Sequence, residues 1–278
     1  MKNFEIGIIG GTGGIGRWFD PFFKGAGYTV HVTGRHSGMS LDDLARTCPV
    51  VIVSVPIEAT LEVIAEIGPK MKKYSLLMDF TSLKEEPVQA MLHHSSSEVM
   101  GCHPLFGPDV PSITDQNIIL CPARVDAWKE WPKEIFEGSG ARVTETTPKR
   151  HDEIMAVVQG LNHFNAMMMG LTLRDAGMDN GEIERFSTPN FTSRLAIVEK
   201  TFKTPRLHSE IIIRNPDIAN ILDLYEENLS QLKRLIREGD IEGMTALLTE
   251  EGSSMEFGYF NHHSQAVMPK VCGTRWRK

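Results

Sequence analysis

The chain has 278 residues, of which 41% are hydrophobic and 23% are charged, so it can bury one large core or two medium ones. Its formal net charge of -7 argues against binding to nucleic acids or anionic membranes, because such partners require clustered Lys and Arg. The cysteines lack CxxC spacing, which argues against a disulfide framework and a structural zinc site.

Neither a membrane span nor a secretory signal is expected. Apolar runs stay shorter than the roughly 18 to 20 residues that cross a bilayer. The start MKNFEIGIIGG lacks the basic region, the apolar region and the cleavage site of a signal peptide. We therefore expect a cytoplasmic protein whose partner is a small-molecule substrate.

The first half of the chain alternates short runs rich in Val and Ile with helical patterns, which is typical of βαβ units on a parallel sheet. This pattern predicts an α/β domain over residues 1–148. The expected strands are Phe4–Ile9, Thr29–Thr33, Val50–Val55, Leu76–Phe80, Val99–Gly101, Asn117–Leu120 and Arg142–Glu145.

The first expected strand runs into a GxGxxG motif that opens a helix, which indicates a dinucleotide-binding turn. Gly11 is expected to permit the tight turn, Gly13 to let the backbone approach a pyrophosphate, and Gly16 to allow close packing of the helix on the sheet. The N–H groups at the start of the helix then receive the phosphate charge. The cofactor-binding residues expected here are Gly11, Thr12, Gly13, Gly14, Ile15 and Gly16.

The second expected strand has no acidic residue at its end, where an NAD site usually presents Asp or Glu to the ribose hydroxyls. It ends instead in Thr33-Gly34-Arg35-His36-Ser37, and a guanidinium at this place favours the 2′-phosphate of NADP. NAD is the alternative, with Arg35 stacked on the adenine or exposed to solvent. The cofactor-binding residues expected in this region are Thr33, Arg35 and His36.

From Lys149 onward apolar residues recur at helical spacing, which predicts an all-α domain over residues 149–278. The first long helix is apolar around much of its circumference, so we expect a homodimer that forms through the helical domain. Further helices are expected at about 190–203, 206–214, 217–238 and 240–258. The stripe that the first helix is expected to bury consists of Ile154, Val157, Val158, Leu161, Phe164, Met168 and Leu171.

Three further motifs follow expected strands, at the carboxyl ends where open α/β sheets bind ligands. They are Val53-Ser54-Val55-Pro56, Asp79-Phe80-Thr81-Ser82-Leu83-Lys84 and Gly101-Cys102-His103-Pro104-Leu105-Phe106-Gly107-Pro108. With the glycine turn and Gln159-Gly160-Leu161-Asn162-His163-Phe164, their order resembles the prephenate and arogenate dehydrogenase family from about Glu5 to Phe260. The resemblance is most specific in the stretch HPLFGPDVPS, and the cofactor is expected to contact Ser54, Val55 and Pro56.

The resemblance implies an α/β Rossmann-like dinucleotide-binding domain followed by an all-α dimerisation and substrate domain. It also implies oxidative decarboxylation of prephenate to 4-hydroxyphenylpyruvate, with hydride transfer to NADP or NAD, on the route to tyrosine. The carbon that bears the ring hydroxyl loses a hydride, and departure of the ring carboxylate as CO2 makes the ring aromatic. This chemistry requires a positioned base and no metal.

His103 and Ser82 are the expected catalytic residues, and both are also expected to contact the substrate. Neutral imidazole can take a proton near physiological pH, and His103 follows an expected strand, so we expect it to accept the hydrogen bond of the ring hydroxyl. Ser82 resembles the family serine that orients this histidine or binds the same hydroxyl. Asp79 and Lys84 are interpreted as a local structural pair.

Gln159 and His163 are expected to bind the substrate from the helical half. They are four residues apart, hence about 40° apart in helix projection, which places them in one polar patch. By the resemblance, His163 faces the substrate. His151 and Asp152 match the family's pattern at the start of the helix and are interpreted as structural, with Asp152 in the first turn.

Lys200 stands where the resemblance places an arginine that binds a substrate carboxylate. Lys offers a point charge where Arg offers a planar fork, so Arg194 on the same predicted helix is the alternative substrate-binding cation. The two are six residues apart, about 120° in projection, and are not expected to point at one substrate.

Three alternative functions stay open. In the first, the substrate is arogenate, which differs from prephenate in a side-chain amine. In the second, the chain is another NADP-dependent dehydrogenase of the β-hydroxyacid dehydrogenase-like superfamily, or an imine reductase; these usually carry a Lys where this chain has His163. In the third, the chain is a non-catalytic dinucleotide sensor, which would need neither His103 nor Ser82.

Overall fold

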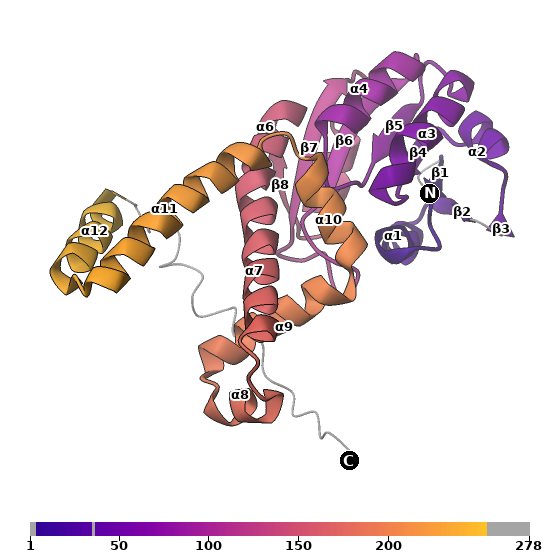
Figure 1. Cartoon of the computed structure of the whole chain (residues 1–278). Helices are drawn as coiled ribbons and strands as arrows, with labels where there is room; N and C mark the ends of the chain where they lie inside the picture. Colours follow the sequence, from indigo (N-terminus) through magenta and orange to yellow (C-terminus); the bar gives the residue numbers. More distant parts are fainter. Residues whose placement is uncertain (1–3, 35–36, 255–278) are drawn as a thin grey trace. The chain divides into compact units, whose positions relative to one another are not determined.

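The computed structural model describes residues 4–34 and 37–254 of the chain (Figure 1). The chain divides into two compact units, Met1–Ile221 and Leu222–Lys278. The first unit holds the sheet, the helices α1 to α10 and the start of α11 (Ile218–Glu238). The second unit holds the rest of α11 and α12 (Ile241–Ser254). Arg35 and His36, the centre of the predicted NADP contact, lie outside the described residues.

Within the described residues, the strands form one eight-stranded sheet in the order β3-β2-β1-β4-β5-β6-β7-β8. Strands β2, β1, β4, β5 and β6 are parallel neighbours. The chain order reverses between β1 and β4, the kind of switch point where α/β sheets bind dinucleotides. The bounds are β1 Glu5–Ile9, β2 Thr29–Gly34, β3 Ser37–Gly38, β4 Val50–Val53, β5 Leu76–Asp79, β6 Glu98–Pro104, β7 Asn117–Arg124 and β8 Arg142–Glu145.

The predicted α/β class is confirmed, but the sheet is not wholly parallel. Strand β7 runs antiparallel to β6, and residues 105–116 join the two without a helix. A parallel neighbour is usually reached through a crossover helix, and this loop contains none. Strand β7 therefore returns along the edge of β6, and His103 lies near the end of β6 from which the loop leaves.

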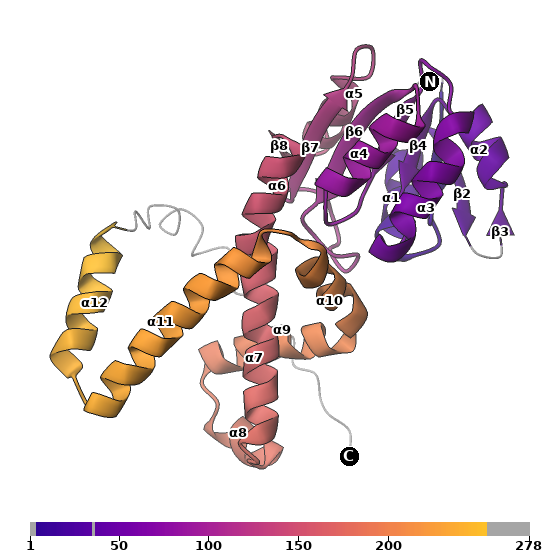
Figure 2. The ribbon, with the colours of Figure 1, turned by 45° about the horizontal axis from the view of Figure 1, so that its top comes forward.

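Helices cover both faces of the sheet because alternate strand residues are apolar on each side. Ile6 and Ile8 of β1 join a core with α1 (Gly14–Gly25) and α5 (Trp131–Glu137). Ile9 faces the other way, into a core with α2 (Leu41–Thr47), α3 (Ile57–Ile67) and α4 (Glu85–His94) (Figure 2). Strands buried on both faces carry continuous apolar runs, which explains why the sequence pattern predicted them. A short 3-10 turn, Gly68–Lys70, follows α3.

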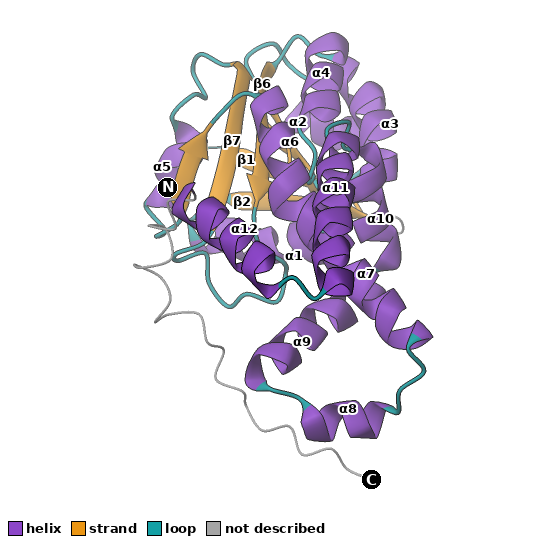
Figure 3. Cartoon of the chain, turned by 60° about the vertical axis from the view of Figure 1, so that its left-hand side comes forward, coloured by secondary structure: helices purple, strands orange, loops and turns teal. Residues whose placement is uncertain are grey.

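The rest of the first unit is helical, as predicted. Helix α6 (Pro148–Met155), a π-helical segment (Ala156–Leu161) and α7 (Asn162–Asp175) form one continuous column (Figure 1). Loops then connect α7 to α8 (Asn180–Phe186) and α8 to α9 (Pro189–Lys203), followed by α10 (Pro205–Arg214) (Figure 3). The side chains of Thr147, Asp179 and Thr188 cap α6, α8 and α9 by accepting a backbone N–H three residues on.

The predicted buried stripe of the long helix is wrong for the isolated chain. Val157 and Val158 are 47% and 54% exposed, and Met168 and Leu171 are also exposed. Buried positions are taken by Met155, Ala156, Gly160 and Ala166. The π-helical segment changes the angular step between successive residues, so a projection at 100° per residue fails across it.

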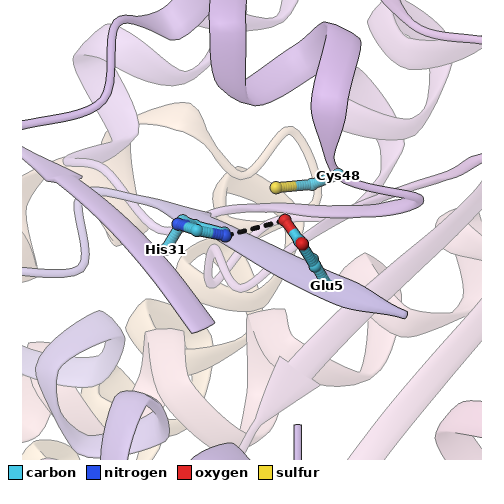
Figure 4. A group of neighbouring side chains, drawn as sticks. All are labelled: Glu5, His31 and Cys48. Atoms are coloured by element: carbon cyan, nitrogen blue, oxygen red, sulfur yellow. Dashed lines mark hydrogen bonds and ion pairs between the residues drawn. The ribbon is translucent and has the colours of Figure 1, made fainter. Parts of the chain in front are cut away.

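A group of potential ligands lies at the amino ends of the strands, away from the glycine turn. Glu5 of β1 and His31 of β2 are hydrogen-bonded at 2.8 Å, with the Cys48 thiol beside them (Figure 4). Burial, and then the charge of Glu5, raises the pKa of Cys48 to about 11, so the thiol stays protonated. We assign this group no part in the candidate site. Among the described residues, no helix has the length and apolar character to cross a membrane.

Candidate functional site

The glycine turn after β1 starts with Gly10 in the left-handed region, at φ 81°. A Cβ at Gly10 would lie 2.3 Å from the carbonyl oxygen of Ser54. The tight turn therefore depends on Gly10, which corrects the expectation for Gly11. Position 11 requires glycine for another reason: a Cβ built there would lie 2.7 Å from the side chain of Val32. The N–H groups of both glycines donate to the carbonyl of Thr33, at 2.8 and 3.2 Å.

The start of α1 offers open backbone to a phosphate group. Gly13 is the N-cap, and no side chain bonds to the first turn. A Cβ on Gly13 or Gly14 would approach other atoms no closer than 3.4 Å, whereas one on Gly16 would lie 2.6 Å from the Gly10 carbonyl oxygen. Gly16 thus holds the helix against the turn, and the N–H groups ahead of it can face an anion. This geometry fits the pyrophosphate of a dinucleotide.

The other expected cofactor residues border this turn. The threonine Thr12 lies against Gly34 at the end of β2, and Ile15 packs on the core of the sheet. The segment Ser54–Pro56 follows β4, with the Ser54 N–H donating to the carbonyl of Ile9 at 2.8 Å. These residues therefore surround the switch point between β1 and β4.

The loop after β6 connects three parts of the candidate site. It begins two residues after His103, which lies near the end of β6. A Cβ on Gly107 would lie 3.5 Å from Nζ of Lys200 in α9, and the ring of Pro108 would lie 3.6 Å from a Cβ on Gly14. The indole N–H of Trp18 donates to the Val110 carbonyl at 2.8 Å and ties the loop to α1. The glycine turn, His103 and Lys200 are thus brought to one loop.

His103 is buried and hydrogen-bonded on both ring nitrogens. Its Nδ1 lies 2.9 Å from Nε2 of His151 in α6, and its Nε2 lies 3.5 Å from Nε2 of Gln159 in the π-helical segment. Burial lowers the pKa of His103 well below its ordinary value, and the nearby His151 and Lys84 lower it further. The imidazole is therefore neutral near pH 7 and can accept a proton.

His151 and Asp152 join His103 to the start of α4. Nδ1 of His151 lies 2.7 Å from Oδ1 of Asp152. The two carboxylate oxygens of Asp152 also accept the backbone N–H groups of Lys84 and Glu85, both at 2.9 Å. The expected placement of Asp152 in the first turn of its own helix is thus corrected, because its charge meets the N-terminus of α4 instead.

Asp79 and Lys84 form the expected local pair. Both side chains are fully buried, and Nζ of Lys84 contacts Oδ2 of Asp79 and Oγ1 of Thr81. Ser82, between them in sequence, is half-buried. Among the described residues it makes no hydrogen bond to His103, so the contact that orients the imidazole comes from His151. A direct part for Ser82 in catalysis stays a prediction.

The helical side of the site carries His163, His208 and Lys200. The rings of His163 in α7 and His208 in α10 are 4.4 Å apart between centroids. Burial, then the charges of His208 and Lys200, lowers the pKa of His163 to about 4. Nδ1 of His163 and Oε1 of Gln159 are buried without a hydrogen-bond partner. These two atoms have free capacity to bind a ligand.

The structure brings Lys200 to this cluster, whereas Arg194 is exposed elsewhere on α9 and forms no side-chain hydrogen bond or ion pair among the described residues. Gln159 and His163 were expected to share one polar patch, but the structure gives them different partners. Gln159 faces His103, whereas His163 faces His208. Sequence reasoning named His151 and Asp152 but interpreted them as structural, without their link to His103, and it did not single out His208.

Comparisons with known protein families agree with this geometry. Residues 33–145 match the family model of the prephenate dehydrogenase nucleotide-binding domain, and residues 147–250 match that of the prephenate dehydrogenase dimerization domain. The chain belongs to the prephenate dehydrogenase family. The predicted resemblance is confirmed. A domain boundary at residue 148 stays a prediction, since the compact units divide after Ile221.

Curated relatives of the family resemble most of the chain. It is 34% identical over 268 residues to the probable arogenate/prephenate dehydrogenase of Methanocaldococcus jannaschii, covering 89% of this chain and 60% of the relative. It is 31% identical over 240 residues to the T-protein of Enterobacter agglomerans, covering 86% of this chain and 64% of the relative. The chain therefore spans less than two thirds of the length of these relatives.

Solved structures of the family share the fold. Prephenate dehydrogenase of Aquifex aeolicus, in complex with hydroxyphenyl propionate and NAD+, superposes with a TM-score of 0.72 at 19% identity, covering 92% of this chain and 99% of that one. Arogenate dehydrogenase of Synechocystis gives a TM-score of 0.66 at 18% identity, covering 90% and 98%. These matches confirm a nucleotide-binding domain followed by a helical region.

Proposed function

We propose that the chain oxidatively decarboxylates prephenate to 4-hydroxyphenylpyruvate with NADP as the hydride acceptor. The observation that carries the proposal is the loop after β6, which follows a neutral buried imidazole closely and lies beside both the Lys200 amine and the start of α1. A base, a cation and a dinucleotide turn are the parts that this reaction requires.

The residues around the glycine turn would hold the cofactor. Gly13 and Gly14 leave the backbone open, and the N-terminus of α1 would receive the pyrophosphate charge. NADP, when bound, supplies the hydride acceptor. Its 2′-phosphate would meet Arg35, since no acidic residue occurs between Thr33 and Leu41 to bind free ribose hydroxyls.

His103 would act as the base for the ring hydroxyl. The hydroxyl proton moves to His103 while the electron pair of the C–H bond on the same carbon leaves as hydride. The C–CO2 bond then breaks, its electron pair enters the ring, and the proton returns to the oxygen. One prephenate dianion thus yields one 4-hydroxyphenylpyruvate anion, one CO2 and one reduced cofactor, with no net proton left on His103. Ser82 would bind the same hydroxyl from the loop after β5.

We prefer prephenate over arogenate because of the cation on the helical side. Lys200 lies close enough to His163 for its charge to lower the pKa of the imidazole. A cation beside a neutral imidazole suits the carboxylates of prephenate, whereas the extra ammonium of arogenate would need an acceptor. Lys200 would bind a carboxylate, and Gln159 and His163 would supply neutral hydrogen bonds.

We further propose that the active form is a homodimer. Val157, Val158 and Met168 leave an apolar surface exposed on the long helix, and the residues that match the dimerization-domain model include it. A second copy would bury this surface. Sedimentation of the purified protein should give a dimer that Val158→Lys weakens, and a monomer at micromolar concentration would contradict the proposal.

Steady-state assays with prephenate and arogenate, each with NADP and NAD, test the function. We expect reduced cofactor to accumulate fastest with prephenate and NADP. Faster turnover of arogenate would reverse the substrate assignment. Binding of NADP without turnover of either substrate would contradict the enzyme and favour a dinucleotide sensor.

A further inference from the structure

A continuous hydrogen-bonded chain lies behind His103, on the side away from Gln159. It starts at the backbone N–H groups of Lys84 and Glu85, passes through the Asp152 carboxylate and His151, and ends at Nδ1 of His103. His151 and Asp152 are buried, so water does not replace any of these contacts. Each group must therefore match its neighbour as donor or acceptor.

The Asp152 carboxylate determines which atom is the donor in every hydrogen bond of this series. It can only accept, because both oxygens already face backbone N–H donors. Nδ1 of His151, at 2.7 Å from Oδ1, must then carry a proton. If His151 is neutral, its Nε2 is a bare acceptor, so the facing Nδ1 of His103 must be the donor.

Two further observations agree with this assignment of donors and acceptors. Burial lowers the pKa of both His103 and His151. For His151 the hydrogen bond to Asp152 raises the pKa, but burial outweighs it and the pKa stays below its ordinary value, so both rings are neutral near pH 7. Nε2 of Gln159, which has only hydrogens to offer, faces Nε2 of His103, which therefore presents its lone pair. If the proton of His151 were on Nε2 instead, its bare Nδ1 would lie 2.7 Å from the Asp152 carboxylate, and two acceptors would be in contact.

We propose that His151 and Asp152 are positioning residues that hold the proton of His103 on Nδ1 and keep Nε2, on the side of Gln159, as the acceptor nitrogen for the substrate. As an account of catalysis this rests on the proposed function, because only a base for the ring hydroxyl needs that nitrogen bare. As a statement about the proton it concerns the protein alone. The start of α4 is thereby coupled to the reacting nitrogen through side chains on another helix.

NMR of the free protein tests the position of the proton. With ¹⁵N-labelled histidine, long-range proton–nitrogen spectra distinguish a bare ring nitrogen from a protonated one, and the signals that vanish in His103→Gln belong to His103. We expect a protonated Nδ1 and a bare Nε2 at pH 7.5. A protonated Nε2 would overturn the proposal. This measurement uses neither cofactor nor substrate, so its outcome is independent of whether the proposed function holds.

A matched pair of variants at residue 151 tests the role in catalysis. Gln places an acceptor oxygen near the position of the histidine Nε2, whereas Phe has a similar size and no acceptor. We expect His151→Gln to keep the proton on Nδ1 and most of kcat. His151→Phe should allow both tautomers and lower kcat by about a hundredfold, within the range of a misprotonated base, while KM changes little.

Thermal unfolding of both variants separates positioning from folding. Equal losses of kcat in His151→Gln and His151→Phe, with the His103 tautomer unchanged in both, would show a merely structural residue and overturn the proposal. If neither prephenate nor arogenate is turned over by the unaltered protein, the proposed function fails, and the NMR result still decides where the proton lies.

Discussion

The candidate site has two sides that differ in how completely their polar groups are satisfied. On the sheet side, His103 is buried and its Nδ1 belongs to a hydrogen-bonded chain that ends at backbone N–H groups. On the helical side, Lys200 is exposed and pairs with no carboxylate among the described residues, and Nδ1 of His163 has no partner. The group whose protonation must be fixed is buried and hydrogen-bonded, whereas the groups that would meet a charged ligand have donors or acceptors still available for it.

This contrast leads to different kinetic expectations for the two sides. A substitution on the sheet side removes an interaction that matters most in the transition state, so it should lower kcat. A substitution on the helical side removes an interaction that the substrate makes throughout, so it should raise KM.

The largest effect is expected for His103→Asn. It keeps a polar side chain of similar reach but removes the base, so kcat should fall by at least about a hundredfold. The affinity for NADP, measured by fluorescence titration, should stay within about threefold, since the residue would not contact the pyrophosphate. Turnover close to that of the unaltered enzyme would remove His103 from the mechanism.

Lys200→Met should raise the KM for prephenate by about thirtyfold, the size of a lost hydrogen bond to a charged group. The matched control is Arg194→Met on the same helix, which should leave KM unchanged. Lys200→Arg keeps the charge and should lie between the two. If Arg194→Met has the larger effect, the carboxylate-binding residue is Arg194.

Arg35→Ala extends the comparison to the cofactor site by comparing NADP with NAD. The variant should raise the KM for NADP by about tenfold and leave that for NAD nearly unchanged, because only NADP carries the 2′-phosphate. Initial rates at varied cofactor concentration measure both constants. An equal loss for the two cofactors would remove the argument for NADP.

The smallest effect concerns stability against pH. The folded pKa of His163, about 4, lies below its ordinary value of 6.5, so between these values the unfolded chain binds more protons. The free energy of unfolding should therefore fall as pH drops through this window, by at most about 1.4 kcal/mol per unit for this group. Urea titrations should show a shallower fall for His163→Phe, and an unchanged slope would mean that the imidazole is solvated.

Much of the sheet side was predictable from the sequence. Strands buried on both faces, such as Val50–Val53, carry apolar runs, and the glycine turn has a mechanism for each small residue. The error at Gly11 arose because the motif fixes the spacing of the glycines but not which one takes a positive φ. The antiparallel β7 was not predictable from loop length, because the segment between the two expected strands is long enough for a crossover.

The contacts that complete the site were less predictable because they join residues far apart in the chain. On the sheet side, His103 and His151 are separated by 48 positions, and no local pattern indicates that their rings meet. The choice between Lys200 and Arg194 needed the loop that carries Gly107. The exposed stripe of Val157 and Val158 followed the expected helical spacing, but spacing does not tell which neighbour will cover it.

The π-helical segment, Ala156–Leu161, has a consequence for how this chain tolerates changes in length. Such a segment behaves like an α-helix with one residue inserted. Deletion of a single residue there would let regular hydrogen bonding run from α6 into α7 and would leave α7 close to its present rotation, because the segment already absorbs the extra residue. Deletion of a residue from α6 would instead rotate His163 away from His208 by about 100°, so the loss of one residue should be tolerated better within the π-helical segment than in α6.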